Sequence, residues 1–472
     1  MEKMDVIDLG MLLLETNAST KHVGGVMVFS YPEGDRNSFI DALYHKFCQK
    51  VCLAEPFNKI PDLIRISPSW KTVKDFAPEE HVFHWTLPSP GDQQELAKTV
   101  ARLHESLLAR DKPLFEMHLI DGLVNNEFAL YFKVHHAYCD GVTGIRMLID
   151  SLSHCPDEET KLIWQVGFSP KEQIHNSGIL SGLAKRVSEL ITTPISSAKA
   201  WANLGFNISM EMLHVTKGNI ILPFSAQHTP FTGQVSSDRN FATCKIPLSE
   251  ISYIRKITGV SFNEATLAIC DIAIHYYLKM HNVKLTKPFI VAVPVSFRKG
   301  SDDSSGGNNV TMMGVELSSK EELHPLKRLL DIRNSHRQAV DMTLSMPKEV
   351  ANSYVIIQAV LCQLAELLGT SEKIPPVANT IISNVPGPKD ELYLNGAALK
   401  ELYPISTLAP GMVANITMVT YTDIMYVGLV STHKKLPDLQ ILAEYFTQAR
   451  SELVAAVKEM ENLDDTETNS TI

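Results

Sequence analysis

The sequence predicts an α/β protein with two similar sandwich domains. Its 472 residues are about twice the number that one hydrophobic core usually organises. The hydrophobic share of 44% and the charged share of 20% are ordinary for a globular chain. Patterns typical of strands and of helices occur in both halves. We therefore expect one domain over residues 1–165, a helical connector over 166–235 and a second domain over 236–472.

In the N-terminal half, a hairpin and the turn that follows it are the clearest local signals. Four shorter elements precede them, which are helices over 36–52 and 93–109 and strands over 60–70 and 81–87. Apolar residues then alternate along 117–134 around two turn-forming pairs, which indicates a hairpin. After Gly141 the apolar spacing becomes helical. Residues 135–141 are therefore expected in a strand-to-helix turn that projects side chains from a rigid support.

The connector is rich in Gly, Ser, Pro and Thr and has few charges. Apolar residues at helical spacing predict two helices within residues 166–234. One interpretation is an interdomain linker packed against the core. The other is a segment that touches membrane or lipid, because a weakly charged amphipathic helix can lie in an interface.

The C-terminal half continues with mixed elements. The expected helices cover 262–278, 326–344, 354–369 and 437–460, the expected strands cover 289–295 and 380–385, and a hairpin is expected over 415–421 and 424–432. An acidic, Thr-rich tail is expected to be disordered.

Composition excludes several classes of function. A net charge of -10 argues against nucleic acid as a partner, which would need a dense Lys/Arg surface. Seven scattered cysteines argue against a disulfide framework and favour a reducing, cytoplasmic setting. The N-terminus lacks the pattern of a signal peptide, and no apolar run reaches the roughly 18 residues of a membrane span. The oligomeric state is left open.

The strongest chemical signal is the run His135-His136-Ala137-Tyr138-Cys139-Asp140-Gly141. A neutral imidazole, with an ordinary pKa of about 6.5, can deprotonate an alcohol as it attacks a thioester. Neighbouring strand residues face opposite sides, so one histidine is expected in a channel and the other in support of it. Asp140 is expected to hold the turn through a distant Arg or local backbone N–H groups. Gly141 is expected to adopt a conformation closed to other residues.

This constellation resembles the His-His-x-x-x-Asp-Gly motif of acyl-CoA-dependent acyltransferases with the chloramphenicol acetyltransferase fold, which include condensation domains. One branch, the bacterial wax ester synthase/diacylglycerol acyltransferase family, is similar over nearly the whole length. The matching segments are Asp8, 12–15, 22–24, 81–82, 87–91, 110–116, 294–298, 383–388 and 411–417. Two departures are visible: the family's Pro-Leu-Trp is Pro113-Leu114-Phe115, and its Asn-Asp pair is Asn263-Glu264.

The resemblance implies two chloramphenicol acetyltransferase-like sandwich domains with an active-site channel between them. Acyl-CoA would enter from one face, and a long-chain alcohol or diacylglycerol from the other. His136 would be the general base, while His135 and Asp140 would support it. No cofactor is expected, since acyl-CoA is a substrate. The insoluble products imply peripheral association with the inner membrane or lipid inclusions.

Further site residues are expected from the second domain. An oxyanion needs hydrogen-bond donors, and the candidates are Asn384, Thr417 and Asn415. Each could equally be an ordinary residue of a sheet or strand end. Structural support is expected from Asn263, Glu264, Pro113 and Leu114.

Other chemistries have weaker support. Cys139 lies beside the histidines, but residues next to each other in sequence rarely face each other as nucleophile and base. Adjacent imidazoles cannot easily aim at one metal ion, so no metal is expected. Two rival functions stay open. One is a condensation-type transferase that takes its acyl group from a carrier protein, and the other is a non-catalytic lipid-binding protein of the same fold.

Overall fold

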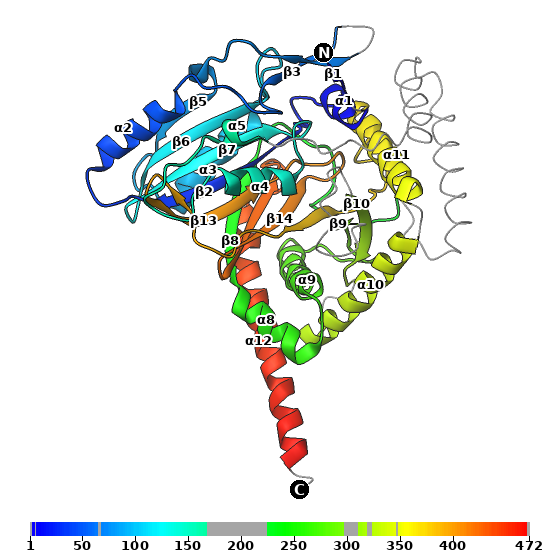
Figure 1. Ribbon diagram of the computed structural model, residues 1–472. Coiled ribbons are helices and arrows are strands. Elements are labelled where there is room, and N and C mark those ends of the chain that lie inside the picture. The colour runs from blue at the N-terminus through cyan, green and yellow to red at the C-terminus, as the bar shows by residue number, and fades with distance from the viewer. Residues whose placement is uncertain are drawn as a thin grey trace.

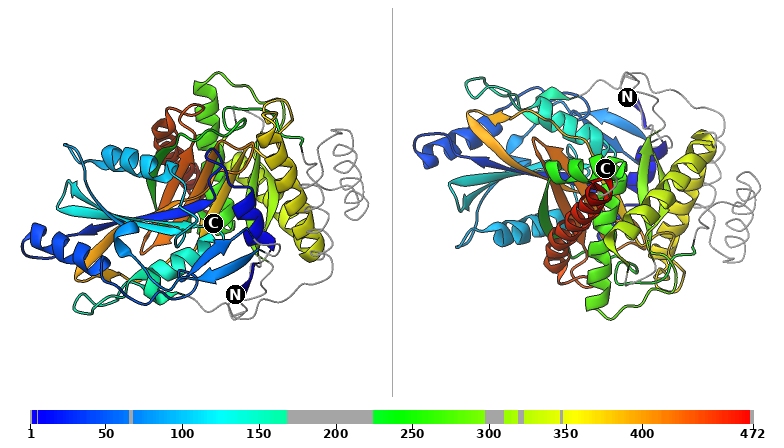
Figure 2. Two further views of the ribbon diagram at one scale, coloured as in Figure 1. Left: turned by 90° about the horizontal axis from the view of Figure 1, so that it is seen from above. Right: turned by 90° about the horizontal axis from the view of Figure 1, so that it is seen from below.

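The computed structural model describes residues 2–4, 6–64, 68–167, 224–296, 310–318, 323–345 and 348–469. Two six-stranded mixed sheets form the body, and helices pack around them (Figure 1). The predicted α/β class with two sandwich units is confirmed. Helices α2 (Arg36–Phe47) and α11 (Lys348–Leu367) lie at opposite ends of the molecule (Figure 2).

The first sheet has the order β12-β13-β2-β7-β6-β5. Its strands are β2 (His22–Ser30), β5 (Val82–Thr86), β6 (Phe115–Leu123), β7 (Glu127–His135), β12 (Tyr393–Leu394) and β13 (Ala397–Ile405). Strands β5 and β6 are parallel, and the other neighbours are antiparallel. The predicted hairpin is β6–β7. It turns at Asn125 and Asn126, which both have a φ of 61°, a conformation that Asn tolerates better than most residues.

Three helices flank this sheet, and a small sheet lies beside it. Helix α2 and helix α3 (Gln93–Glu105) begin at the aspartates Asp35 and Asp92, whose side chains accept backbone N–H groups. Helix α4 (Gly141–Asp150) follows β7. The expected strand over 60–70 is instead a pair, β3 (Lys59–Asp62) and β4 (Ser69–Thr72), which forms the small sheet with β1 (Glu2–Lys3). The remaining short elements are α1 (Val6–Leu13), η1 (Pro78–Glu80) and α5 (Ile163–Val166).

The second sheet has the order β10-β9-β11-β14-β15-β8. Its strands are β8 (Asn240–Pro247), β9 (Ile290–Ser296), β10 (Val310–Glu316), β11 (Thr380–Val385), β14 (Ala414–Tyr421) and β15 (Ile424–Ser431). The helices of this half are α8 (Leu248–Thr258), α9 (Phe262–Met280), α10 (Pro325–Ser345), α11 and α12 (Leu439–Asn469). Helices α9 and α12 pack against each other beside the sheet. The expectation of a disordered tail is wrong as far as Asn469, because α12 continues to that residue.

Strands β12 and β13 come from the C-terminal half but complete the first sheet, where β13 pairs with β2. Strand β13 also packs against β14 and β15 of the second sheet. The approach is very close at Gly428, where a Cβ atom would lie 1.9 Å from the carbonyl oxygen of Pro404. The boundaries drawn at 165 and 235 stay predictions, but the two halves of the chain share a sheet.

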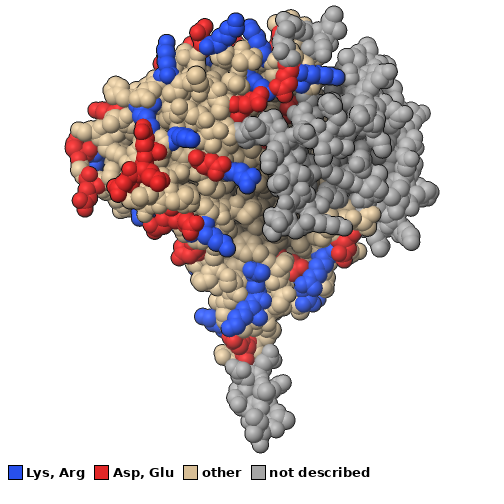
Figure 3. Space-filling view, viewed as in Figure 1, with Lys and Arg blue, Asp and Glu red and all other residues tan. Residues whose placement is uncertain are grey.

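Residues 168–223 lie outside the described residues, so the two connector helices and any lipid contact there stay predictions. In the described ranges, no single helix is long and apolar enough to cross a membrane. Helices α8 and α9, which meet at an angle of 108°, have the length and the apolar composition of a membrane span only when the two are taken together. On the part of the face that Figure 3 draws in colour, acidic and basic side chains are interspersed.

Candidate active site

The motif lies in a strand-to-helix turn, as predicted: β7 ends at His135 and α4 begins at Gly141. Backbone hydrogen bonds fix this turn from both sides. The N–H of His135 donates to the carbonyl of Leu114 over 2.9 Å, and the N–H of His136 donates to the carbonyl of Lys21 over 2.7 Å. The turn is thereby tied to the chain just before β6 and just before β2.

Leu114 holds the turn a second time. Its N–H donates to the Tyr138 hydroxyl over 3.0 Å, and that hydroxyl donates to the carbonyl of Lys59. The carbonyl of Pro113 accepts the N–H of Phe115 over 2.9 Å. The Phe115 ring, in place of the family's Trp, is stacked on the Trp164 ring at a centroid distance of 5.4 Å. Pro113 and Leu114 therefore sit where they can support the motif.

Asp140 is the N-cap of α4. Its carboxylate accepts the backbone N–H of Thr143 over 2.8 Å, so it holds the turn through a local backbone group. The expectation for Gly141 was wrong, because its φ lies outside the left-handed region that favours glycine. A Cβ atom at Gly141 would meet no atom of the described residues within 4 Å. What glycine provides at this position is open space beside the turn.

The His135 side chain is enclosed, with 1% of it exposed. Its Nδ1 accepts the N–H of Ala137 over 3.0 Å, which places the ring proton on Nε2. That nitrogen faces Glu15, whose Oε2 lies 3.5 Å away. This environment favours the supporting role.

His136 is partly buried, and its pKa lies below the ordinary value. Burial is the main cause, since it penalises the charged imidazolium. The negative charge of Asp140 and the residue's own backbone oppose that effect, while the positive charge of Lys21 reinforces it. A lowered pKa keeps the imidazole neutral near neutral pH, so one of its ring nitrogens is an acceptor. The ring is thus in the protonation state that a general base needs.

Asn415 and Thr417 lie on the same face of β14 and are linked to the motif turn. The Thr417 hydroxyl donates to Asn415 Oδ1 over 2.7 Å, and Asn415 Nδ2 donates to the carbonyl of Thr407 over 3.1 Å. The Thr407 hydroxyl in turn donates to the carbonyl of Thr20, one residue before Lys21. A chain of hydrogen bonds therefore leads from these two oxyanion candidates to the segment that binds the His136 N–H.

Asn384 lies near the end of β11 and contacts a different support residue. Its Nδ2 donates to Asn263 Oδ1 on the first turn of α9 over 3.1 Å. Its own Oδ1 is buried with no hydrogen-bond partner among the described residues. No hydrogen bond or ion pair described here joins Asn384 to the motif turn, so its role as an oxyanion donor stays a prediction.

Glu264 helps to cap the N-terminus of α9, a role that the Ser-x-x-Glu pattern in the sequence could have revealed. It forms a capping box with Ser261, three residues earlier, and binds Arg337 Nε over 2.9 Å. Burial would raise the pKa of Glu264, but the hydrogen bonds from Arg337 and Ser261 hold it below its ordinary value. The Ser-x-x-Glu spacing explains why an acid longer than the family's Asp fits here.

A group of buried charges around residues 15–21 escaped the sequence analysis. Its members are Glu15, Lys21, Arg239 and Glu366, each less than 9% exposed. Burial lowers the pKa of Lys21 to about 8, although Glu15 and Glu366 oppose that effect. Arg239, from the C-terminal half, donates to the carbonyl of Ala18 over 2.7 Å. This cluster marks the place where the two halves meet beside the motif.

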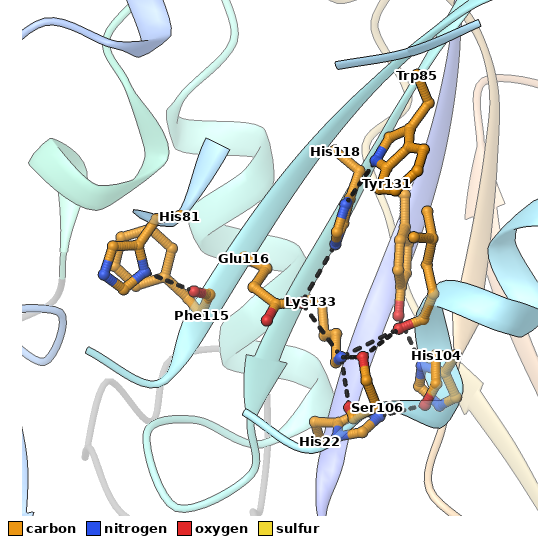
Figure 4. Close-up of polar contacts among 11 residues, drawn as sticks. His22, His81, Trp85, His104, Ser106, Phe115, Glu116, His118, Tyr131 and Lys133 are labelled. Atoms are coloured by element: carbon orange, nitrogen blue, oxygen red, sulfur yellow. Dashed lines mark hydrogen bonds and ion pairs between the residues drawn. The ribbon is translucent and has the colours of Figure 1, made fainter. Parts of the chain in front are cut away.

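A second buried network fastens α3 to the first sheet (Figure 4). Lys133 on β7 donates to the carbonyls of Leu103 and Ser106 over 3.0 and 2.6 Å, and its ammonium lies 3.2 Å from Glu116 Oε2. The other members are His22, Trp85, His104, His118 and Tyr131. A buried ammonium needs such partners, and the network thereby anchors the strand that ends in the motif.

Cys139 is buried, and burial together with the Asp140 charge raises its pKa far above the ordinary value. It is therefore a neutral thiol. Since the thiolate is the reactive form, Cys139 is unsuited to act as a nucleophile.

Comparisons with known proteins identify the family. The model of the wax ester synthase/diacylglycerol acyltransferase catalytic domain matches residues 4–266, and that of the family's C-terminal domain matches residues 306–453. The chain is 33% identical to O-acyltransferase WSD of Acinetobacter baylyi, covering 95% of this chain and 96% of that protein. It is 30% identical to the probable diacylglycerol O-acyltransferase tgs2 of Mycobacterium tuberculosis, covering 97% and 100%.

Solved structures agree. The wax ester synthase/diacylglycerol acyltransferase from Marinobacter aquaeolei superposes with a TM-score of 0.76 at 27% identity, covering 97% of this chain and all of that one. The first condensation domain of the CDA synthetase gives 0.55 at 14% identity, with 96% of each chain covered, and shows the shared fold alone. This chain is an acyltransferase that belongs to the wax ester synthase/diacylglycerol acyltransferase family.

Proposed function

We propose that this enzyme transfers a long-chain acyl group from acyl-CoA to a fatty alcohol, giving a wax ester, or to diacylglycerol, giving triacylglycerol. The supporting observation is the family match along nearly the whole chain, together with a neutral His136 held in a strand-to-helix turn. The condensation domains share only the fold at this level of identity, so they do not favour a carrier-dependent reaction. The intact motif argues against a non-catalytic lipid-binding role.

In the proposed reaction, His136 Nε2 takes the hydroxyl proton while the alcohol oxygen attacks the thioester carbonyl. The tetrahedral intermediate then expels CoA thiolate, and the imidazolium gives that thiolate the proton taken from the alcohol, so free CoA and neutral His136 are formed. The thioester is already activated, so the proposal needs neither a covalent enzyme intermediate nor a cofactor. Asn415, Thr417 and Asn384 are the candidate donors to the oxyanion, and Thr417 would have to turn its hydroxyl proton away from Asn415 to serve as one.

We also propose peripheral association with the inner membrane or with lipid inclusions, because the products are insoluble in water. The test is co-flotation of the purified protein with triacylglycerol emulsions coated with phospholipid. Binding to the emulsion supports the proposal, and full recovery in the aqueous phase contradicts it.

The reaction is tested by thiol release from palmitoyl-CoA with hexadecanol and, separately, with diacylglycerol. We compare the wild type with His136→Ala and with His154→Ala, which removes an exposed histidine away from the motif. Acceptor-dependent release that is lost only in His136→Ala supports the mechanism. Full activity of His136→Ala contradicts the assignment of the base. A wild type that releases no thiol with either acceptor contradicts the proposed reaction.

A further inference from the structure

Glu15 is a buried acid that lies beside the His135 side chain. It lies in the loop after α1, and 1% of its side chain is exposed. Both of its oxygens are used: Oε1 accepts the backbone N–H of Lys21 over 2.8 Å, and Oε2 accepts a hydrogen bond from Arg110 Nη2 over 3.3 Å. Oε2 also faces His135 Nε2 at 3.5 Å.

These contacts connect Glu15 to both histidines of the motif. Glu15 meets the side chain of His135 on one side and the N–H of Lys21 on the other. The carbonyl of that same Lys21 accepts the N–H of His136 over 2.7 Å. A shift of the carboxylate would therefore move both the His135 ring and the segment before β2 that fixes the His136 backbone.

The carboxylate also faces the protonated nitrogen of His135. Because Nδ1 accepts the N–H of Ala137, the ring proton is on Nε2. Among the described residues that nitrogen has no partner at normal hydrogen-bond distance, and Glu15 is the acceptor that faces it. Burial would raise the pKa of Glu15, but His135 and the Lys21 N–H hold it below its ordinary value, so the acid is ionised.

We propose that Glu15 is a positioning residue for acyl transfer, which holds His136 in its working orientation through His135 and Lys21. This inference rests on the proposed function, in which His136 is the base. Glu15 touches no reacting atom in this role. Its loss therefore lowers kcat and leaves substrate binding, and with it KM, nearly unchanged.

The main variant is Glu15→Gln, since a carboxamide offers one acceptor oxygen where Glu15 uses two and turns a donor toward Lys21 or His135. Displacing a reacting group by about 1 Å costs roughly 100-fold in rate, so we expect kcat to fall roughly 10- to 100-fold. KM for palmitoyl-CoA and for hexadecanol should change by less than about threefold.

Asp271→Asn is a closely matched control. Asp271 is also fully buried, and its carboxylate meets the same three kinds of group. It accepts the Ser318 N–H over 3.1 Å and Arg328 over 2.8 Å, and it lies 3.1 Å from His275 Nδ1, which hydrogen-bonds the Asp271 carbonyl over 2.7 Å. It lies on α9, away from the motif. If Glu15 has a purely structural role, Glu15→Gln and Asp271→Asn should lose similar amounts of thermal stability and similar amounts of kcat. Our proposal predicts that only Glu15→Gln loses kcat in the folded protein.

A double variant tests whether Glu15 acts through His135. We expect Glu15→Gln combined with His135→Gln to have a kcat within about threefold of His135→Gln alone, because the two changes break one interaction. Losses that multiply contradict the proposal, as does a Glu15→Gln protein with wild-type kcat. If Glu15→Gln fails to fold, Glu15→Asp decides, since its shorter side chain retreats from His135 and should still lower kcat.

His136→Ala is assayed beside these variants. If His136→Ala is inactive and Glu15→Gln is fully active, only the role of Glu15 fails. If His136→Ala is active, the assignment of the base fails as well.

Discussion

At the scale of the residue, the protonation of His136 depends on opposing influences. Burial and the positive charge of Lys21 lower its pKa, while Asp140 and the residue's own backbone raise it. Burial prevails, so the pKa lies below the ordinary 6.5. A base acts in its neutral form, and a lower pKa extends that form to lower pH.

We therefore expect the acidic limb of the kcat/KM profile to have its midpoint below pH 6.5. Activity should be full above that midpoint and fall as the pH drops through it, because the imidazole becomes protonated. Asp140→Asn removes a charge that raises the pKa, so its limb should move to still lower pH. The measurement is kcat/KM from pH 4.5 to 8.5 for both proteins, and a wild-type midpoint at or above 6.5 contradicts it.

At the scale of the element, α4 and β7 hold the motif from its two ends. The cap of α4 comes from Asp140, which accepts the N–H of Thr143. Strand β7 is fastened to the end of α3 by Lys133, whose ammonium is fully buried. Each device leaves a separate signature in stability.

The cap is tested by comparing Asp140→Asn with Asp140→Ala. Asn caps helices about as well as Asp, whereas Ala leaves a terminal N–H unpaired, so Ala should be less stable than Asn by about 1 kcal/mol. Urea unfolding followed by far-UV circular dichroism measures the difference. Equal stability of the two variants would show that the cap contributes nothing.

The anchor is tested with Lys133→Met. Removing the ammonium leaves the partly buried Glu116 carboxylate with less compensation, so we expect a loss of about 3 kcal/mol. Lys133→Met combined with Glu116→Gln removes both charges and should recover part of that loss. Chemical unfolding of the three proteins provides the comparison, and a double variant less stable than Lys133→Met contradicts the account.

At the scale of the whole molecule, the two sheets meet where β13 crosses β15. There is no room for a side chain at Gly428, because a Cβ atom would lie 1.9 Å from the carbonyl oxygen of Pro404. The charged cluster at Lys21 and Arg239 joins the same two halves beside the motif. The contact between the halves is therefore tight and specific.

Gly428→Ala should force these backbones apart and cost about 3 kcal/mol. Gly10→Ala is the control, since a Cβ atom there meets no atom of the described residues within 4 Å and the residue lies in helix α1. Differential scanning fluorimetry should show a lower Tm for Gly428→Ala only. An unchanged Tm would mean that the sheets can separate without cost.

The sequence predicted those features whose residues lie close together along the chain. The hairpin, the motif turn and strand β11 have local patterns, and the structure confirms them. Strand β13 was missed because its partner β2 lies in the other half of the chain. Glu15 was recognised only as part of a family segment, since its contact with His135 is formed by the fold. The interpretation of Gly141 failed because glycine there provides space and not an unusual φ.

Strand β13, which the C-terminal half contributes to the first sheet, limits how this enzyme can be recombined. A chimaera joined in the connector would place β12 and β13 of one parent beside β2 of the other. The hybrid sheet would then depend on cross-strand pairs such as Val26 with Tyr403 and Met27 with Leu402, drawn from two parents. Exchanging acceptor or donor preferences between relatives therefore requires residues 393–405 to travel with the N-terminal half.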